Sequence, residues 1–265
     1  MGAIRPPAVA GTFYPAVAGR LHAAVGGFLA AANGSCAEQR PKALIAPHAG
    51  YVYSGAVAGH AFAALGEAAS QIRRVVVIGP AHYVPFRGIA APRAEAFRTP
   101  LGDVPLDRAA IAGILDLPQI ALADAPHRPE HAIEVELPFL QVVLGELALV
   151  PILVGDATGD EVAGVLGRLW DGPETLIVIS SDLSHYEAYA SAKEHDGTTA
   201  AAIERFDDAA LGPRDACGYL PIAGLLVEAR RRGMRIERLD LRNSGDTAGP
   251  KDQVVGYGAW AFCEA

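Results

Sequence analysis

Four short apolar runs recur along the chain, at positions 43–46 (ALIA), 74–78 (RVVVI), 149–154 (LVPILV) and 176–179 (LIVI). Runs that are apolar on both faces are typical of central strands covered by helices on each side. Two further strands are predicted near 234–242 and 253–262. Helical spacing of apolar residues is found near 20–32, 54–66, 108–115, 130–144, 158–170, 190–205 and 219–232. This alternation predicts an α/β fold, a single domain whose central, mostly parallel or mixed sheet is flanked by helices on both faces.

The composition excludes several classes of function. With 51% hydrophobic and 20% charged residues, a chain of 265 residues can bury a full core and is not a disordered protein. The net charge of −8 speaks against the clustered positive surface that nucleic-acid binding needs. Positions 43–66 carry no charge, but Pro47, His48 and several glycines interrupt them, so a buried strand–loop–helix is expected rather than a membrane span.

Cysteine usage points to a reducing compartment. Cys36, Cys217 and Cys263 are an odd number of widely spaced residues without a CxxC motif, which is typical of free thiols rather than a disulfide framework. The first residues, MGAIRPPAVAG, lack the apolar stretch of a signal peptide. We therefore expect a cytoplasmic protein.

Histidines follow three of the four apolar runs at the point where each strand should end. His48 follows the first run, His82 the second and His185 the fourth. In open α/β sheets, ligands bind outside the carboxyl ends of the strands, which meet at one edge. The sequence therefore predicts a functional site at this edge.

His48 and His82 are the best candidates for metal ligands, because neutral imidazole binds iron, zinc and copper and strand ends can hold two rings close together. The alternative is that both rings merely cap neighbouring backbone groups. Cys217 stands where a C-terminal helix begins, a position that favours the metal-binding thiolate. Its alternative role is that of a small apolar core residue.

Two further polar segments accompany these candidates. A helix over 130–144 would place His131 and Glu134 on one face, with Glu130 beside Glu134, although acidic residues in a first turn also simply complement the helix dipole. Asp182 and His185 follow the fourth apolar run. A Ser–His–Asp hydrolase built from adjacent residues here is disfavoured, because nucleophile and base normally come from separate loops.

Five motifs, in this order, resemble those of the Memo-like family, whose prokaryotic branch is called AmmeMemoRadiSam system protein B. They are PHAGYxYSG (47–55), GPAHYVP (79–85), EHAIEVELPFLQ (130–141), SSDLSHY (180–186) and CGYLPI (217–222). Agreement also covers AVAGTFYPA (8–16), FRTPLGDV (97–104) and the closing VVGYGAWAF, so residues 1–265 resemble one Memo-like domain.

The resemblance implies the fold of the class III extradiol dioxygenases and a mononuclear non-haem iron site. It implies His48, His82 and Cys217 as metal ligands, with the catalytic candidates His185, Asp182, His131 and Glu134 around them. The dioxygenases use a carboxylate where this chain has Cys217. The resemblance implies Fe(II) as the metal. Because thiolate is a softer ligand than carboxylate, copper and zinc are the alternatives.

Two functions remain open from the sequence. The first is a metal-dependent oxidoreductase acting on an unknown small molecule or peptide. The second is a non-catalytic module that sequesters metal, or binds a peptide or partner in the former active-site cleft. The family name also links such proteins to a radical-SAM protein and a protein with an AMMECR1-like domain.

Overall fold

The computed structural model describes residues 3–32 and 40–264. Its central sheet is built on four parallel strands, β2 (Pro41–Ala46), β9 (Thr175–Ser180), β3 (Arg74–Pro80) and β8 (Ala148–Val154), in this spatial order. These are the four strands expected from the apolar runs, and almost every residue in them is buried. Burial on both faces explains why their sequences do not alternate.

Antiparallel strands extend this sheet on both sides. β12 (Val254–Cys263) pairs with β2 and with β11 (Arg235–Asn243), while the short β10 (His185–Glu187) pairs with the start of β12. On the other side β4 (Ile89–Ala91) is antiparallel to β8, and β7 (Ile120–Leu122) follows β4. The sheet is therefore mixed, and the predicted fold class is confirmed.

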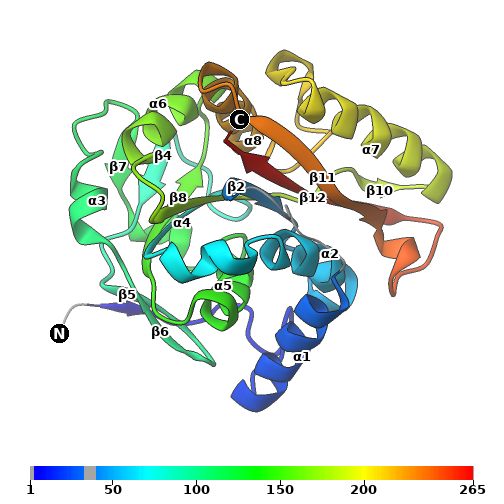
Figure 1. Ribbon diagram of the computed structural model, residues 1–265, viewed down its shortest axis with the longest axis horizontal. Coiled ribbons are helices and arrows are strands. Elements are labelled where there is room, and N and C mark those ends of the chain that lie inside the picture. The colour runs from blue at the N-terminus through cyan, green and yellow to red at the C-terminus, as the bar shows by residue number, and fades with distance from the viewer. Residues whose placement is uncertain (1–2, 33–39, 265) are drawn as a thin grey trace.

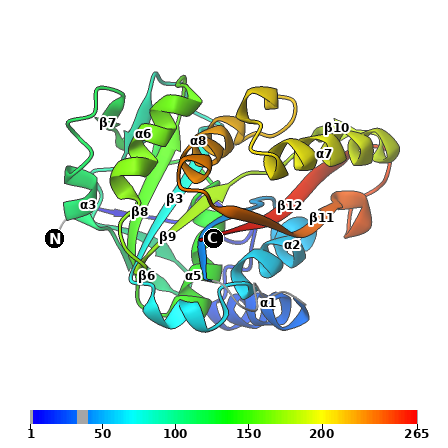
Figure 2. The ribbon, with the colours of Figure 1, turned by 45° about the horizontal axis from the view of Figure 1, so that its top comes forward.

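Helices cover both faces of the sheet (Figures 1 and 2). One face carries α1 (Ala18–Ala31), α2 (Tyr51–Ala63) and α5 (Leu137–Leu144), which pack on one another. On the other face α6 (Gly159–Leu169) packs against α8 (Tyr219–Arg231), and α7 (Tyr189–Glu204) lies along β11 and β12. The shorter α3 (Arg108–Ala112) and α4 (Asp124–His127) lie in the connections near β4 and β7.

A small second sheet was not expected from the sequence. It joins β1 (Ile4–Arg5) to the hairpin of β5 (Ala96–Thr99) and β6 (Gly102–Pro105). These strands have two to four residues each, too few for an apolar pattern to stand out. The buried apolar residues nevertheless form one continuous core that runs from Val9 to Cys263.

The expected helix over 130–144 is wrong in its first part. Residues Glu134–Glu136 form a single 3₁₀ turn and the α-helix begins only at Leu137, with Pro138 in its first turn. Proline is well tolerated there because the first N–H groups of a helix have no partner within it. His131 therefore lies in a non-helical turn.

Across residues 3–32 and 40–264, no helix combines the length and the apolar character that crossing a bilayer requires.

Candidate metal centre

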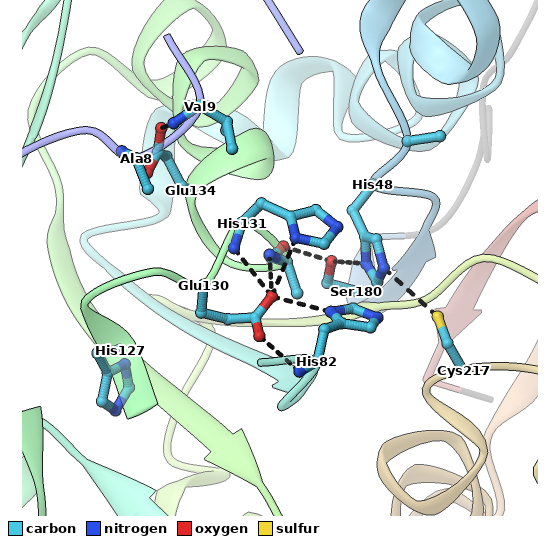
Figure 3. Close-up of polar contacts among 12 residues, drawn as sticks. Ala8, Val9, His48, His82, His127, Glu130, His131, Glu134, Ser180 and Cys217 are labelled. Atoms are coloured by element: carbon cyan, nitrogen blue, oxygen red, sulfur yellow. Dashed lines mark hydrogen bonds and ion pairs between the residues drawn. The ribbon is translucent and has the colours of Figure 1, made fainter. Parts of the chain in front are cut away.

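Histidines from three separate segments meet at the carboxyl edge of the parallel strands (Figure 3). His48 follows β2, His82 follows β3, and His131 lies in the turn before α5. One nitrogen of each ring lies within 4.8 Å of a nitrogen of both others. Distances of this order allow a single ion to be shared after small side-chain adjustments. The segments are distant in sequence, so only the fold brings the three rings together.

Two members of the histidine group, His48 and His131, are held in the neutral, metal-binding form. Burial, reinforced by the neighbouring His82, lowers the pKa of His48 to about 3. Burial, reinforced by His48, lowers the pKa of His131 to about 4. The ring of His131 stacks on that of His82 at 4.6 Å between centroids, and the ring of Phe13 lies tilted against it at 4.7 Å. At neutral pH both buried rings therefore keep a lone pair that a cation can accept.

A buried hydrogen-bond chain orients His48. Its Nδ1 lies 2.7 Å from Oγ of Ser180, and that hydroxyl donates to the carbonyl of Ala132 at 2.6 Å. Because the hydroxyl proton is used in this way, Ser180 accepts from His48, and we assign the ring proton to Nδ1. The lone pair then lies on Nε2. Such support behind the ligand is the usual arrangement for a metal-binding histidine.

Behind Ser180 lies the carboxyl group of Glu136. Its Oε1 is 2.9 Å from Oγ of Ser180, and its Oε2 is buried without a hydrogen-bond partner among the described residues. Burial raises the pKa of Glu136 well above its ordinary value. Burial thus favours the protonated form of this carboxyl, which closes the hydrogen-bond chain behind Ser180.

Glu130 plays the corresponding part for His82. Its Oε1 accepts from Nδ1 of His82 at 2.9 Å, and its Oε2 accepts from the backbone N–H of the same residue at 2.7 Å. The backbone N–H groups of His131 and Ala132 also donate to Oε1, at 2.9 and 3.0 Å. Burial opposes ionisation of this carboxyl, but the hydrogen bond and charge of His82 outweigh it and lower the pKa of Glu130 to about 2.

This carboxylate was not among the site residues predicted from the sequence. The expected helix directed attention to the pairing of Glu130 with Glu134, whereas the observed turn wraps the Glu130 side chain around the next two N–H groups. The only available signal was the adjacency of a glutamate and a histidine in the EHxxE motif. Ser180 and Glu136 were likewise not predicted as supports of a ligand.

His131 has an unpaired buried nitrogen. Its Nδ1 lies 3.2 Å from Oε1 of Glu130, but not in the direction of a hydrogen bond, and it has no other partner among the described residues. A buried polar atom of this kind normally has a water or an ion as its partner. The residues present therefore fit a metal ion.

Cys217 lies beside the histidine group, just before α8. Its Sγ is 3.4 Å from Nε2 of His48 and accepts from the backbone N–H of Asp182 at 3.3 Å. Burial, followed by the charge of Asp182, raises the pKa of this thiol to about 12, opposite to the direction expected from the helix start. Ionisation of Cys217 therefore needs a strong compensating charge, which a bound cation supplies.

Asp182 and His185 lie on the β9 side of the site. Oδ1 of Asp182 accepts from the backbone N–H groups of His48 and Ala49, at 2.9 and 3.3 Å, and thereby fixes the turn that carries His48. Burial raises the pKa of Asp182, while the charge of His185 lowers it. His185 is exposed, and its Nδ1 lies 2.7 Å from the carbonyl of Leu183. The pair therefore reaches from the buried wall of the site to its rim.

Glu134 has a different environment from the one expected. It is fully buried, and its carboxylate accepts from the backbone N–H groups of Ala8 and Val9 (Figure 3). Nη1 of Arg5 at 2.6 Å and the hydroxyl of Tyr14 at 2.5 Å also donate to it. All four donors belong to the N-terminal segment, which carries Phe13 onto the ring of His131. Glu134 thus anchors a wall of the site.

One further histidine and one further cysteine lie away from the site. His127 is in α4, with Nε2 3.1 Å from the carbonyl of Ala90, and it is not part of the histidine group. Cys263 is buried in β12, and Cys36 lies outside the described residues.

The architecture and the site together define an α/β protein whose parallel strand ends carry a group of histidines able to hold a metal ion. The family model described as Memo-like protein matches residues 5–261, and the chain belongs to this family. The resemblance seen in the five motifs is therefore confirmed.

Curated relatives match over nearly their full length. A MEMO1 family protein of Aeropyrum pernix is 38% identical over 281 residues, which cover 97% of this chain and 98% of the relative. A MEMO1 family protein of Methanosarcina mazei is 36% identical over 272 residues, with 97% and 98% covered. Among solved structures, an uncharacterized protein of Escherichia coli K12 superposes with a TM-score of 0.52 at 14% identity, covering 84% of this chain and 100% of that one. That similarity concerns the fold alone.

Proposed function

We propose that this Memo-like protein binds one transition-metal ion between His48, His82 and His131, with Cys217 as a further ligand. The observation that carries the proposal is the convergence of three ring nitrogens within 4.8 Å at the carboxyl edge of the sheet. Ser180 binds Nδ1 of His48 and Glu130 binds Nδ1 of His82, so Nε2 of each ring is left for the metal. The ligand set of His48, His82 and Cys217 implied by the family resemblance is thereby extended by one imidazole.

The donor set restricts the metal. Imidazole suits iron, copper and zinc, and thiolate adds a preference for soft ions such as Cu(I). Magnesium and calcium are disfavoured, because they prefer oxygen ligands. We propose Fe(II) as the resident ion, with copper or zinc as the alternatives.

We propose an oxidoreductase activity on an organic substrate as the function of this centre. The metal would supply one-electron and oxygen chemistry. The chain itself would bind the ion, exclude water with the ring of Phe13 against His131, and offer the buried carboxyl of Asp182 and the exposed ring of His185 as proton donors or acceptors.

Metal sequestration is the second candidate. The contact of Cys217 with His48 at 3.4 Å favours it, because sulfur and imidazole together retain Cu(I) tightly. In this function the cleft binds metal, peptide or partner without turnover. A radical-SAM protein and a protein with an AMMECR1-like domain remain the proposed partners.

Metal analysis of variants tests the proposal. His82→Ala should abolish stoichiometric binding, and Cys217→Ser should weaken it roughly tenfold or more. His60→Gln is the matched control, because His60 lies in α2 beside Asp240, outside the histidine group. Wild-type metal content in both site variants would refute the proposal. Oxygen uptake by the iron-loaded chain would favour the oxidoreductase, and suppression of copper redox cycling would favour sequestration.

A further inference from the structure

A cavity of about 280 Å³ adjoins the candidate metal centre on the side of Cys217. It lies between the carboxyl ends of β3 and β8 and the start of α8. Apolar side chains make up most of its wall, among them those of Pro80, Phe86, Val154 and Leu220. Its volume is just below the range of roughly 300–1,000 Å³ that is common for sites of drug-sized ligands, so it suits one ring with a short chain.

The wall formed by Phe86 is preformed. The backbone N–H of Asp156 donates to the carbonyl of Phe86 at 2.8 Å, and that of Gly155 donates to the carbonyl of Gly88 at 2.9 Å. A Cβ atom at Gly155 would lie 2.3 Å from the carbonyl oxygen of Phe86 and 3.0 Å from its ring. Only glycine allows this close approach, which holds the aromatic ring against the end of β8.

The cavity wall carries negative charge, from Asp156. Among the described residues that line it there is no lysine or arginine, and Asp156 supplies the one carboxyl group. The Asp156 side chain is exposed and makes no hydrogen bond or ion pair with the described part of the chain; its contacts are those of its backbone. Arg87 pairs with it through the backbone, yet its guanidinium neither lines the cavity nor forms an ion pair with Asp156. A carboxylate or phosphate ligand would find no cation in this wall.

We propose that the cavity binds the apolar body of a small organic amine, whose ammonium group pairs with Asp156. This inference rests on the proposed function, because it makes the amine the substrate that reaches the metal centre past Cys217. Aromatic and proline side chains supply the apolar surface, with Phe86 and Tyr219 among the residues that line the cavity.

Three ligands with one phenylethyl body test the proposal: 2-phenylethylamine, 2-phenylethanol and 3-phenylpropanoate. Their affinities are measured by calorimetry at neutral pH, first on chain stripped with a chelator and then on iron-loaded chain. The amine should bind about fivefold more tightly than the alcohol, which is what a partly exposed ion pair contributes, and the carboxylate more weakly than either. Measurement on stripped chain separates this proposal from the metal proposal, because amine binding there does not depend on the ion.

Asp156→Asn should remove the preference for the amine and leave the affinity for the alcohol unchanged. Asp160→Asn is the control, because it deletes the same charge nearby, on an exposed residue of α6 that does not line the cavity. The proposal is overturned if none of the three ligands binds, if 3-phenylpropanoate binds as tightly as the amine to stripped chain, or if Asp156→Asn keeps the amine preference.

Discussion

Replacing Glu130 by glutamine tests the support of the metal centre without changing a ligand. Glutamine keeps the shape of the side chain and one carbonyl oxygen, which can still accept from the N–H groups of His131 and Ala132 and from His82. The new NH₂ group then faces the backbone N–H of His82, which in the wild type donates to Oε2 of Glu130 at 2.7 Å. Two donors oppose each other, and the negative charge beside the His82 ring is lost.

The magnitude follows from these contacts. One buried N–H left without an acceptor costs about 1–3 kcal/mol, so we expect the free energy of unfolding of the metal-free chain to fall by about 2 kcal/mol. Loss of the carboxylate behind a metal-binding histidine typically reduces metal affinity about 10–100-fold, and we expect the same for iron or copper here.

The assay combines urea unfolding of stripped chain with a competitive metal titration against a chelator. Glu67→Gln is the control, since Glu67 is exposed in the 3₁₀ segment Gly66–Gln71 and should change neither quantity. If Glu130→Gln binds metal as tightly as the wild type while Glu67→Gln behaves normally, Glu130 does not support the ligand and the reasoning fails.

Three further substitutions have defined outcomes. Glu136→Gln should leave metal affinity unchanged and alter the free energy of unfolding by less than about 1 kcal/mol, because burial favours the neutral form of this carboxyl; a loss of about 3 kcal/mol in urea unfolding would contradict this. Glu134→Gln should cost about 3 kcal/mol in the same assay, since it breaks a buried ion pair with Arg5; an unchanged midpoint would contradict this. His195 lies between Glu187 and Asp215 at 2.8 and 2.7 Å, and the hydrogen bond to Asp215, with that to Glu187, raises its pKa. Its stabilising effect is therefore complete below the ordinary histidine pKa of about 6.5 and is lost as pH rises through the raised value. His195→Gln should thus lower the free energy of unfolding more at about pH 5.5 than at about pH 8.5. An equal loss at both pH values would refute the assignment.

The sequence predicts best what depends on one segment at a time. The four central strands are uniformly apolar, so burial on both faces could be inferred without a structure. The position of His48 and His82 at one edge followed from the parallel arrangement of their strands. Strands β1 and β7, with two and three residues, have no such pattern and depend on their partners.

The site residues that were missed depend on tertiary contacts. Glu130 supports His82 because the chain turns at His131 instead of continuing as a helix, and a helical pattern cannot reveal that turn. Glu134 stands four residues later with the same side chain, yet its carboxylate accepts hydrogen bonds from the N-terminal segment instead. The spacing of Glu130 and Glu134 in the sequence therefore could not show which of them supports a metal ligand.

The most direct test of the metal-binding proposal is elemental analysis by mass spectrometry of the chain isolated from its own host without added metal. We predict one iron or copper ion per chain, retained through gel filtration. A chain that is isolated without metal, and that then takes up none of iron, copper or zinc in equilibrium dialysis, would contradict the proposal.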